Sequence, residues 1–189
     1  MNDQAIAVTL LVIDTLELLQ VQYVIGGSLA SAMHGVARTT LDSDLVADLR
    51  LEHVEQFVDQ LKGEFYLAAE AMIDAITYRS SFNLIHLETM FKVDIFIPKQ
   101  RHFDCQQLKN RTAIIVSENP VRIAYLASPE DTILAKLDWY RMGGETSERQ
   151  WHDVLGVIRV QRRLLNLTYL EQLAAEMNLS DLLEKALHL

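Results

Sequence analysis

Short apolar runs alternate with helical segments through the first two thirds of this 189-residue chain, and this order constrains the fold more than any other feature. Strand-like runs cover residues 23–25, 42–49, 82–87, 91–97, 113–116 and 121–125. Apolar residues at helical spacing cover residues 3–19, 28–34, 51–61 and 68–76. The alternation predicts an α+β fold in which helices flank a mixed sheet, and the 82–87 and 91–97 runs predict a hairpin.

From residue 127 onward the pattern is helical throughout. Ser128-Pro129-Glu130-Asp131 combines a capping serine, a proline in the first turn and two acids near the positive end of the helix dipole. This helix is expected to end near Met142, before two glycines, and further helices are expected over 147–163 and 167–189. We therefore predict a core of residues 1–126 and a C-terminal helical region of residues 127–189 packed on it.

Composition excludes several classes of protein. Half of the residues are apolar, which is enough to build a core, and no apolar run approaches the roughly 18 residues of a membrane span. The start lacks a positively charged leader and there is one cysteine, Cys105, so we expect a cytoplasmic protein without disulfides. The net charge of −9 argues against binding to duplex DNA, although basic residues concentrated in 99–163 can still hold a triphosphate or an RNA end.

Two acidic residues are spaced so that they share one face of a strand. Asp42 and Asp44 lie two apart in the 42–49 run, and a strand places such side chains on the same side of the sheet. Asp94 lies at the centre of the 91–97 run, so pairing of the two strands would bring three carboxylates together. Three like charges at that range need a cation, and hard divalent ions such as Mg²⁺ take oxygen ligands. The pattern predicts a site for two Mg²⁺ ions.

An anion site is expected just upstream. Gly27 and Ser28 stand at a strand-to-helix turn, where unpaired backbone N–H groups and the helix dipole attract phosphate. Glycine allows a phosphate to approach the backbone, Ser28 adds a hydroxyl donor, and Arg38 can contribute a fork of donors. A phosphate cradle next to a carboxylate cluster is the arrangement that transfer from a nucleoside triphosphate requires.

Three motifs in this order resemble those of a known family. The runs 26–30 (Gly-Gly-Ser-Leu-Ala) and 38–44 (Arg-Thr-Thr-Leu-Asp-Ser-Asp) are similar to the Gly-Ser … Arg-x-Thr-x-Asp-x-Asp signature of DNA polymerase beta-like nucleotidyltransferases. The run 92–96 (Lys-Val-Asp-Ile-Phe) resembles the family's second motif. Within that superfamily the chain is most similar to the AbiEii-type nucleotidyltransferases, the toxin components of type IV toxin–antitoxin systems.

Later segments extend the resemblance over roughly residues 20–160. The helix that begins at Ser128 and leads to Lys136 is similar to a family helix whose lysine contacts the triphosphate. The run 149–153 (Arg-Gln-Trp-His-Asp) is similar to an Arg-Asp-x-x-Asp element, with Gln150 where the family often has Asp.

The resemblance implies a Mg²⁺-dependent nucleotidyltransferase that moves NMP from an NTP to an acceptor hydroxyl and releases pyrophosphate. It implies that Asp42, Asp44 and Asp94 are the catalytic, metal-binding residues, with Asp94 as base or organiser of the attacking hydroxyl. Gly27, Ser28 and Lys136 would bind the nucleotide together with Arg38. Implied acceptors are a tRNA 3′ end, a protein or a small molecule such as an aminoglycoside, and an antitoxin is an implied partner.

Other interpretations stay open at this point. The fold can serve as a catalytically silent binding module, for instance the partner of an antitoxin. Ser28 in Gly26-x-Ser28-x-Ala30 half-resembles a hydrolase elbow, although a later acid and histidine are not placed to serve it. By default Lys136 is a solvated surface lysine. Arg149 and Asp153, four apart, can simply form an ion pair within a helix.

Overall fold

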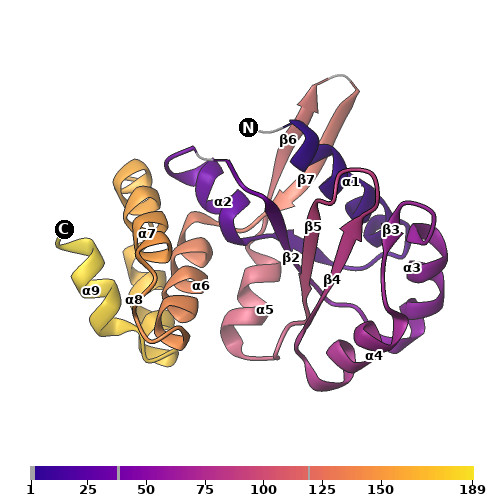
Figure 1. Cartoon of the computed structure of the whole chain (residues 1–189). Coiled ribbons are helices and arrows are strands. Elements are labelled where there is room, and N and C mark those ends of the chain that lie inside the picture. Colours follow the sequence, from indigo (N-terminus) through magenta and orange to yellow (C-terminus); the bar gives the residue numbers. More distant parts are fainter. Residues whose placement is uncertain (1–2, 38, 119) are drawn as a thin grey trace.

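A computed structural model describes residues 3–37, 39–118 and 120–189 of the chain (Figure 1). Within these residues the chain forms a seven-stranded sheet in the order β3-β4-β5-β2-β1-β7-β6. The strands are β1 (Tyr23–Ile25), β2 (Asp42–Ala47), β3 (Phe65–Tyr66), β4 (Ser81–His86), β5 (Lys92–Phe96), β6 (Thr112–Glu118) and β7 (Val121–Leu126).

Helices stand at both ends of this sheet. They are α1 (Asp3–Leu18), α2 (Gly27–His34), α3 (Val54–Leu61), α4 (Ala69–Tyr78), α5 (His102–Lys109), α6 (Pro129–Met142), α7 (Glu148–Gln161), α8 (Leu167–Glu176) and α9 (Ser180–Leu187), with a 3₁₀ turn (Leu51–His53) before α3. Figure 1 shows α6 to α9 gathered at one end of the molecule and α3 and α4 at the other, with the sheet between them. None of the described helices is long and apolar enough to cross a membrane.

The sheet is mixed, as the sequence predicts. β2 runs parallel to β5 and antiparallel to β1, and β4 and β5 form the expected antiparallel hairpin. β1 also lies parallel to β7, which pairs antiparallel with β6. The predicted α+β class, with a mixed sheet flanked by helices, is confirmed. The acidic residues lie on β2, the central strand, and on its neighbour β5.

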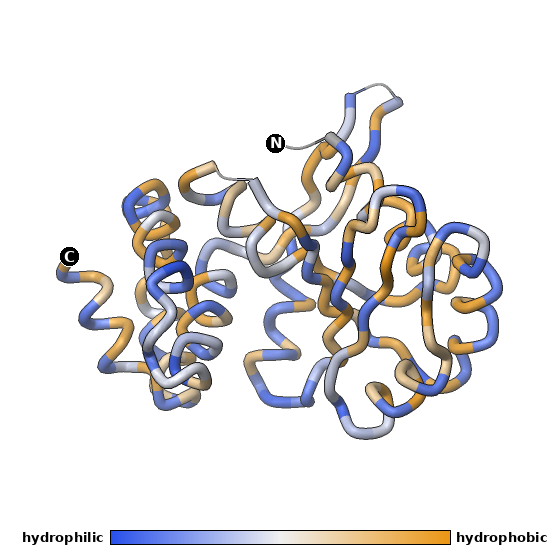
Figure 2. Tube along the Cα trace, viewed as in Figure 1, coloured by the Kyte–Doolittle hydropathy of each residue, from blue (hydrophilic) through white to orange (hydrophobic). Residues whose placement is uncertain are grey.

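Two large hydrophobic clusters and one small one hold the described residues together. The first joins α1, α2, α3 and α4 to the strands, the second joins α6 to α9 with Phe103 of α5, and the small third one consists of Val24, Leu108 and Ala127. Figure 2 shows the corresponding hydrophobic stretches along the strands and on the inner sides of the helices. Burial of apolar surface is therefore continuous within each cluster. α2 connects the two large clusters, because it contacts β2 on one side and α6 and α7 on the other.

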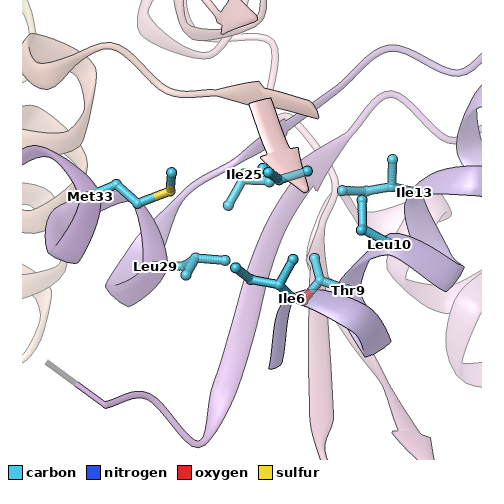
Figure 3. Close-up of a pocket in the computed structure, with 8 residues that line it drawn as sticks. Ile6, Thr9, Leu10, Ile13, Ile25, Leu29 and Met33 are labelled. Atoms are coloured by element: carbon cyan, nitrogen blue, oxygen red, sulfur yellow. The ribbon is translucent and has the colours of Figure 1, made fainter. Parts of the chain in front are cut away.

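The first cluster leaves one small gap in its packing. Figure 3 shows apolar side chains of α1, β1 and α2 facing one another, and the gap between them measures about 10 Å³. Its lining residues are Ile6, Thr9, Leu10, Ile13, Ile25, Leu29, Met33 and Val116. A space no larger than about one water molecule, with apolar walls, offers water no hydrogen-bond partners, so we regard it as a packing irregularity and not as a binding site.

Two elements lie outside the sequence predictions. α5 begins at His102, where Arg101 N donates to Asp104 Oδ2 at 3.1 Å and so closes the first turn. β3 is only two residues long and pairs with β4 through Phe65 and Tyr66. The helix expected to begin at Ser28 begins one residue earlier, at Gly27.

Candidate active site

The acidic residues meet because β2 and β5 are paired in register. Asp44 lies directly opposite Asp94, and Asp42 lies opposite Lys92. Residues 43, 45 and 47 of β2 are buried, whereas 42, 44 and 46 are half-buried on the opposite face. The strand pairing expected from the sequence is confirmed, and it places Asp42, Asp44 and Asp94 on one face of the sheet.

The three carboxylates do not converge into a ready cation cage. Among the described residues there is no group of three His, Cys, Asp or Glu side chains arranged to hold a metal ion. Asp94 Oδ2 is instead 2.7 Å from Lys92 Nζ, two residues earlier on the same strand. This ion pair raises the pKa of Lys92, and the negative charges of Asp42 and Asp44 raise it further. A cationic side chain thus offsets part of the negative charge of this row of acids.

Asp42 and Asp44 have different surroundings. Thr40 Oγ1 donates to the backbone oxygen and to Oδ1 of Asp42, both at 2.9 Å, and so holds the Asp42 carboxylate at the start of β2. Burial raises the pKa of Asp44, the neighbouring charge of Asp42 raises it further, and the N–H of Ser28 opposes these effects. A positive charge placed next to Asp44 would therefore stabilise the ionised form of its carboxyl group.

The turn before α2 lies directly against Asp44. Gly26 N donates to the backbone oxygen of Asp44 at 2.9 Å, and Ser28 N donates to Asp44 Oδ2 at 3.3 Å. Gly27 has φ +53°, and a Cβ atom there would be 1.7 Å from Asp44 Oδ2. Only glycine fits this position, because it tolerates the left-handed conformation and leaves space for the carboxylate.

Two helices of the C-terminal region bring basic side chains to the same turn. Lys136 on α6 is 5% exposed, and its Nζ donates to Asp153 Oδ2 on α7 at 2.8 Å. The default interpretation of Lys136 as a solvated surface lysine is therefore wrong, because a buried carboxylate pairs with it. Arg149, also on α7, donates to Ser28 Oγ at 3.2 Å. Arg149 and Asp153, considered from their spacing as an ion pair within one helix, each have a partner outside α7.

A groove of about 740 Å³ connects these parts. Of the residues predicted to form the site, Gly27, Ser28, Asp42, Asp44 and Lys136 line it. Asp94 lies beside Asp44 on β5 but does not line the groove, and its carboxylate is paired with Lys92. Arg38 lies outside the described residues.

The groove also contains residues that the sequence reasoning missed. Phe96 and Trp139 line it, with ring centroids 5.5 Å apart in an edge-to-face arrangement. Gln150 lines it next to Arg149, and its buried Oε1 has no hydrogen-bond partner within the part of the chain that the structure describes. One sequence feature could have indicated Trp139 as a groove residue. It follows Lys136 by three residues in a predicted helix, and this spacing places both side chains on one face.

Comparisons with known proteins support the fold. No family model and no curated protein sequence matches the chain. Several solved structures resemble it at low identity, among them the following three. An antigenic nucleotidyltransferase-like protein from Paracoccidioides brasiliensis is 17% identical with a TM-score of 0.56, over 95% of this chain and 91% of that one. The antibiotic-resistance factor ANT(2'')-Ia is 16% identical with a TM-score of 0.58, over 100% and 99% of the two chains.

The third structure is the lincosamide antibiotic adenylyltransferase LnuA with lincomycin bound. It is 15% identical with a TM-score of 0.50, over 78% of this chain and 92% of that chain. These likenesses show that the chain has a nucleotidyltransferase fold. None of the three is described as AbiEii-type, so that finer resemblance rests on the sequence motifs.

Proposed function

We propose that this protein transfers a nucleoside monophosphate from an NTP to an acceptor hydroxyl and releases pyrophosphate. The observation that carries this proposal is the contact between the Gly27 turn and Asp44, because it joins a helix N-terminus to an acidic strand. Such a site brings phosphate-binding N–H groups within reach of carboxylates that bind cations. The nucleotidyltransferase fold supports the same conclusion.

The triphosphate would bind at the start of α2. The Asp44 carboxylate occupies the space beside Gly27 and accepts the N–H of Ser28, so the phosphates would lie next to this carboxylate. The N-terminal N–H groups of the helix carry partial positive charge that attracts them. We assign Ser28 Oγ and the ammonium of Lys136 as side-chain donors to phosphate oxygens, and Arg149 adds a guanidinium beside Ser28. Arg38 keeps the nucleotide-binding role proposed from the sequence.

The carboxylate row suits a hard divalent cation in its chemistry. Asp42, Asp44 and Asp94 supply only oxygen donors, and the Lys92 ammonium that pairs with Asp94 shows that a positive charge is favourable there. We propose that these three residues hold Mg²⁺ in a two-ion site. When bound, Mg²⁺ would neutralise phosphate charge that the carboxylates would otherwise repel.

In the proposed reaction the acceptor oxygen forms a bond to the α-phosphorus as the bond from the α-phosphorus to the α,β-bridging oxygen breaks. Pyrophosphate carries away that oxygen and its electron pair. Asp94 would accept the proton of the acceptor hydroxyl once its carboxylate has left Lys92 and turned toward the groove. Lys136 and the α2 N–H groups hold the leaving phosphates, and Asp44 fixes the turn that presents them. Catalysis by the chain is then mostly positioning and charge stabilisation.

The acceptor is proposed as a hydroxyl on an RNA end, a protein or a small molecule. The motifs that resemble AbiEii-type proteins support a role as a toxin with a neutralising antitoxin as partner. LnuA and ANT(2'')-Ia, described as an antibiotic adenylyltransferase and an antibiotic-resistance factor, support a small-molecule acceptor instead. These alternatives share one reaction and differ only in what receives the NMP.

Labelled NTPs test the reaction directly. The protein is incubated with NTPs labelled at the α- or the γ-phosphate, together with Mg²⁺ and cell extract or candidate acceptors. We expect the α-label to move to an acceptor and the γ-label to appear in pyrophosphate. Asp42→Asn should abolish the transfer, whereas Asp59→Asn, an exposed acid on α3, should leave it unchanged.

Two outcomes would contradict the proposal. Transfer of the γ-label to an acceptor would indicate a kinase. If no NTP raises the melting temperature with or without Mg²⁺, a silent binding module becomes the better interpretation.

A further inference from the structure

One face of α6 continues from the phosphate site into the rest of the groove. Lys136, Trp139 and Met142 are each three residues apart, and all three line the groove. Residues at this spacing are neighbours on a helix surface, and Trp139 lies about 4.5 Å further along the axis than Lys136. Lys136 is buried, whereas Trp139 is 49% exposed and offers part of its ring to solvent within the groove.

The side chains that the sheet contributes change from acidic to apolar over the same distance. Phe96 follows Asp94 by two residues on β5, and its register partner Val46 follows Asp44 by two residues on β2. Two strand residues span about 6.6 Å, so the floor of the groove passes from carboxylates to apolar side chains in one step. Phe96 contacts Trp139 edge-to-face at 5.5 Å, which joins the floor to the α6 wall and fixes the orientation of both rings.

We propose that Trp139, held by Phe96, is the stacking platform for the base of the NTP. The inference rests on the proposed function and adds where the base binds. A nucleotide has a charged end and a flat aromatic end. The groove presents matching groups in the same spatial order, first the Gly27 turn with Lys136 and then Trp139. The indole takes the base by ring stacking, which every base can provide, so the site accepts all four NTPs and favours the larger purines by a few-fold.

Tryptophan fluorescence reports on this contact separately from phosphate binding. Trp139 and Trp151 are the two tryptophans of the chain, and Trp151 lies against Tyr140 and Lys185 among the C-terminal helices. In a Trp151→Phe protein all tryptophan emission therefore comes from Trp139. Titration with each NTP and Mg²⁺ should change that emission saturably, after correction for nucleotide absorbance. Inorganic tripolyphosphate, which lacks a base, should leave the emission unchanged while displacing the NTP.

Affinity measurements on variants complete the test. Trp139→Ala should weaken NTP binding at least about fivefold while tripolyphosphate binding changes less than about twofold. Trp139→Phe should recover most of the NTP affinity, because a phenyl ring still stacks. Tyr66→Ala, which removes an exposed aromatic side chain on β3 outside the groove, should change neither affinity.

The outcomes separate this inference from the proposed function. NTP binding with unchanged Trp139 emission, or with full affinity in Trp139→Ala, would overturn the platform and leave the reaction in place. Quenching of Trp139 by an acceptor but by no NTP would assign the ring to the acceptor and equally overturn it. Failure of both NTP and tripolyphosphate to bind would overturn the proposed function and the platform with it.

Discussion

Replacing Gly27 by alanine tests the contact on which the site is built. The new Cβ would lie 1.7 Å from Asp44 Oδ2, 2.4 Å from its Cγ and 2.6 Å from its Cβ, so rotation of the carboxylate alone cannot relieve the overlap. A left-handed conformation costs a non-glycine residue about 1–2 kcal/mol, and overpacking costs about 1–3 kcal/mol. We therefore expect Gly27→Ala to lower the free energy of unfolding by about 2–5 kcal/mol.

Gly144 provides a matched control for the backbone part of this effect. It also has positive φ, at +70°, but no atom lies within 4 Å of the position that a Cβ would occupy there. Gly144→Ala should therefore show only the conformational cost of about 1–2 kcal/mol. The difference between the two variants, measured by urea unfolding, isolates the contact with Asp44.

The same substitution should remove activity. Displacing Asp44 or the turn by about 1 Å moves the phosphate site relative to the carboxylates, and misplacement of that size costs about 100-fold in rate. Gly144→Ala, outside the groove, should transfer NMP at the wild-type rate. Equal destabilisation of the two variants, together with full transfer by Gly27→Ala, would refute the reasoning.

Three further predictions concern charge. Lys136→Met removes one partner of a buried ion pair and should destabilise the fold by as much as about 3 kcal/mol in urea unfolding, whereas a loss below about 1 kcal/mol would contradict the buried pairing. Burial and the negative charge of Asp42 raise the pKa of Asp44, so between the pKa values of the unfolded and native states the native protein binds more protons than the unfolded chain, and this stability contribution is lost as pH rises. Asp44→Asn should therefore be inactive yet more stable than wild type at neutral pH, with an advantage that shrinks on acidification; a constant difference across pH would contradict this. Lys92→Gln removes the ammonium at Asp94 and should increase the rise in melting temperature produced by Mn²⁺, whereas an unchanged rise would show that Lys92 and the metal do not compete.

Local signals allowed much of the fold to be predicted from the sequence. Ser128 caps α6 as expected, with its Oγ accepting from Asp131 N at 3.0 Å, and the helix ends at Met142 before the two glycines. The period of two along β2 placed Asp42 and Asp44 on one face, which the burial pattern confirms. α5 was missed because its two buried apolar residues, Phe103 and Leu108, are five apart and give no helical repeat.

The features that could not be predicted from the sequence are tertiary contacts. The burial of Lys136 depends on Asp153, which belongs to another helix, and the spacing within α7 had suggested Arg149 as the partner of that acid. The aromatic contact of Trp139 depends on Phe96, which belongs to a strand of the sheet. The helical and strand periods predict which residues share a face of one element. They do not predict which faces of different elements pack together, and the groove lies where α6, α7 and the sheet pack.

The most direct test of the account is a crystal structure with Mn²⁺ and a non-hydrolysable NTP analogue. We predict anomalous peaks from Mn²⁺ among the carboxylates of Asp42, Asp44 and Asp94, with the triphosphate on the Gly27–Ser28 turn. A bound analogue whose phosphates lie away from that turn, or manganese held elsewhere while the three carboxylates carry none, would contradict it.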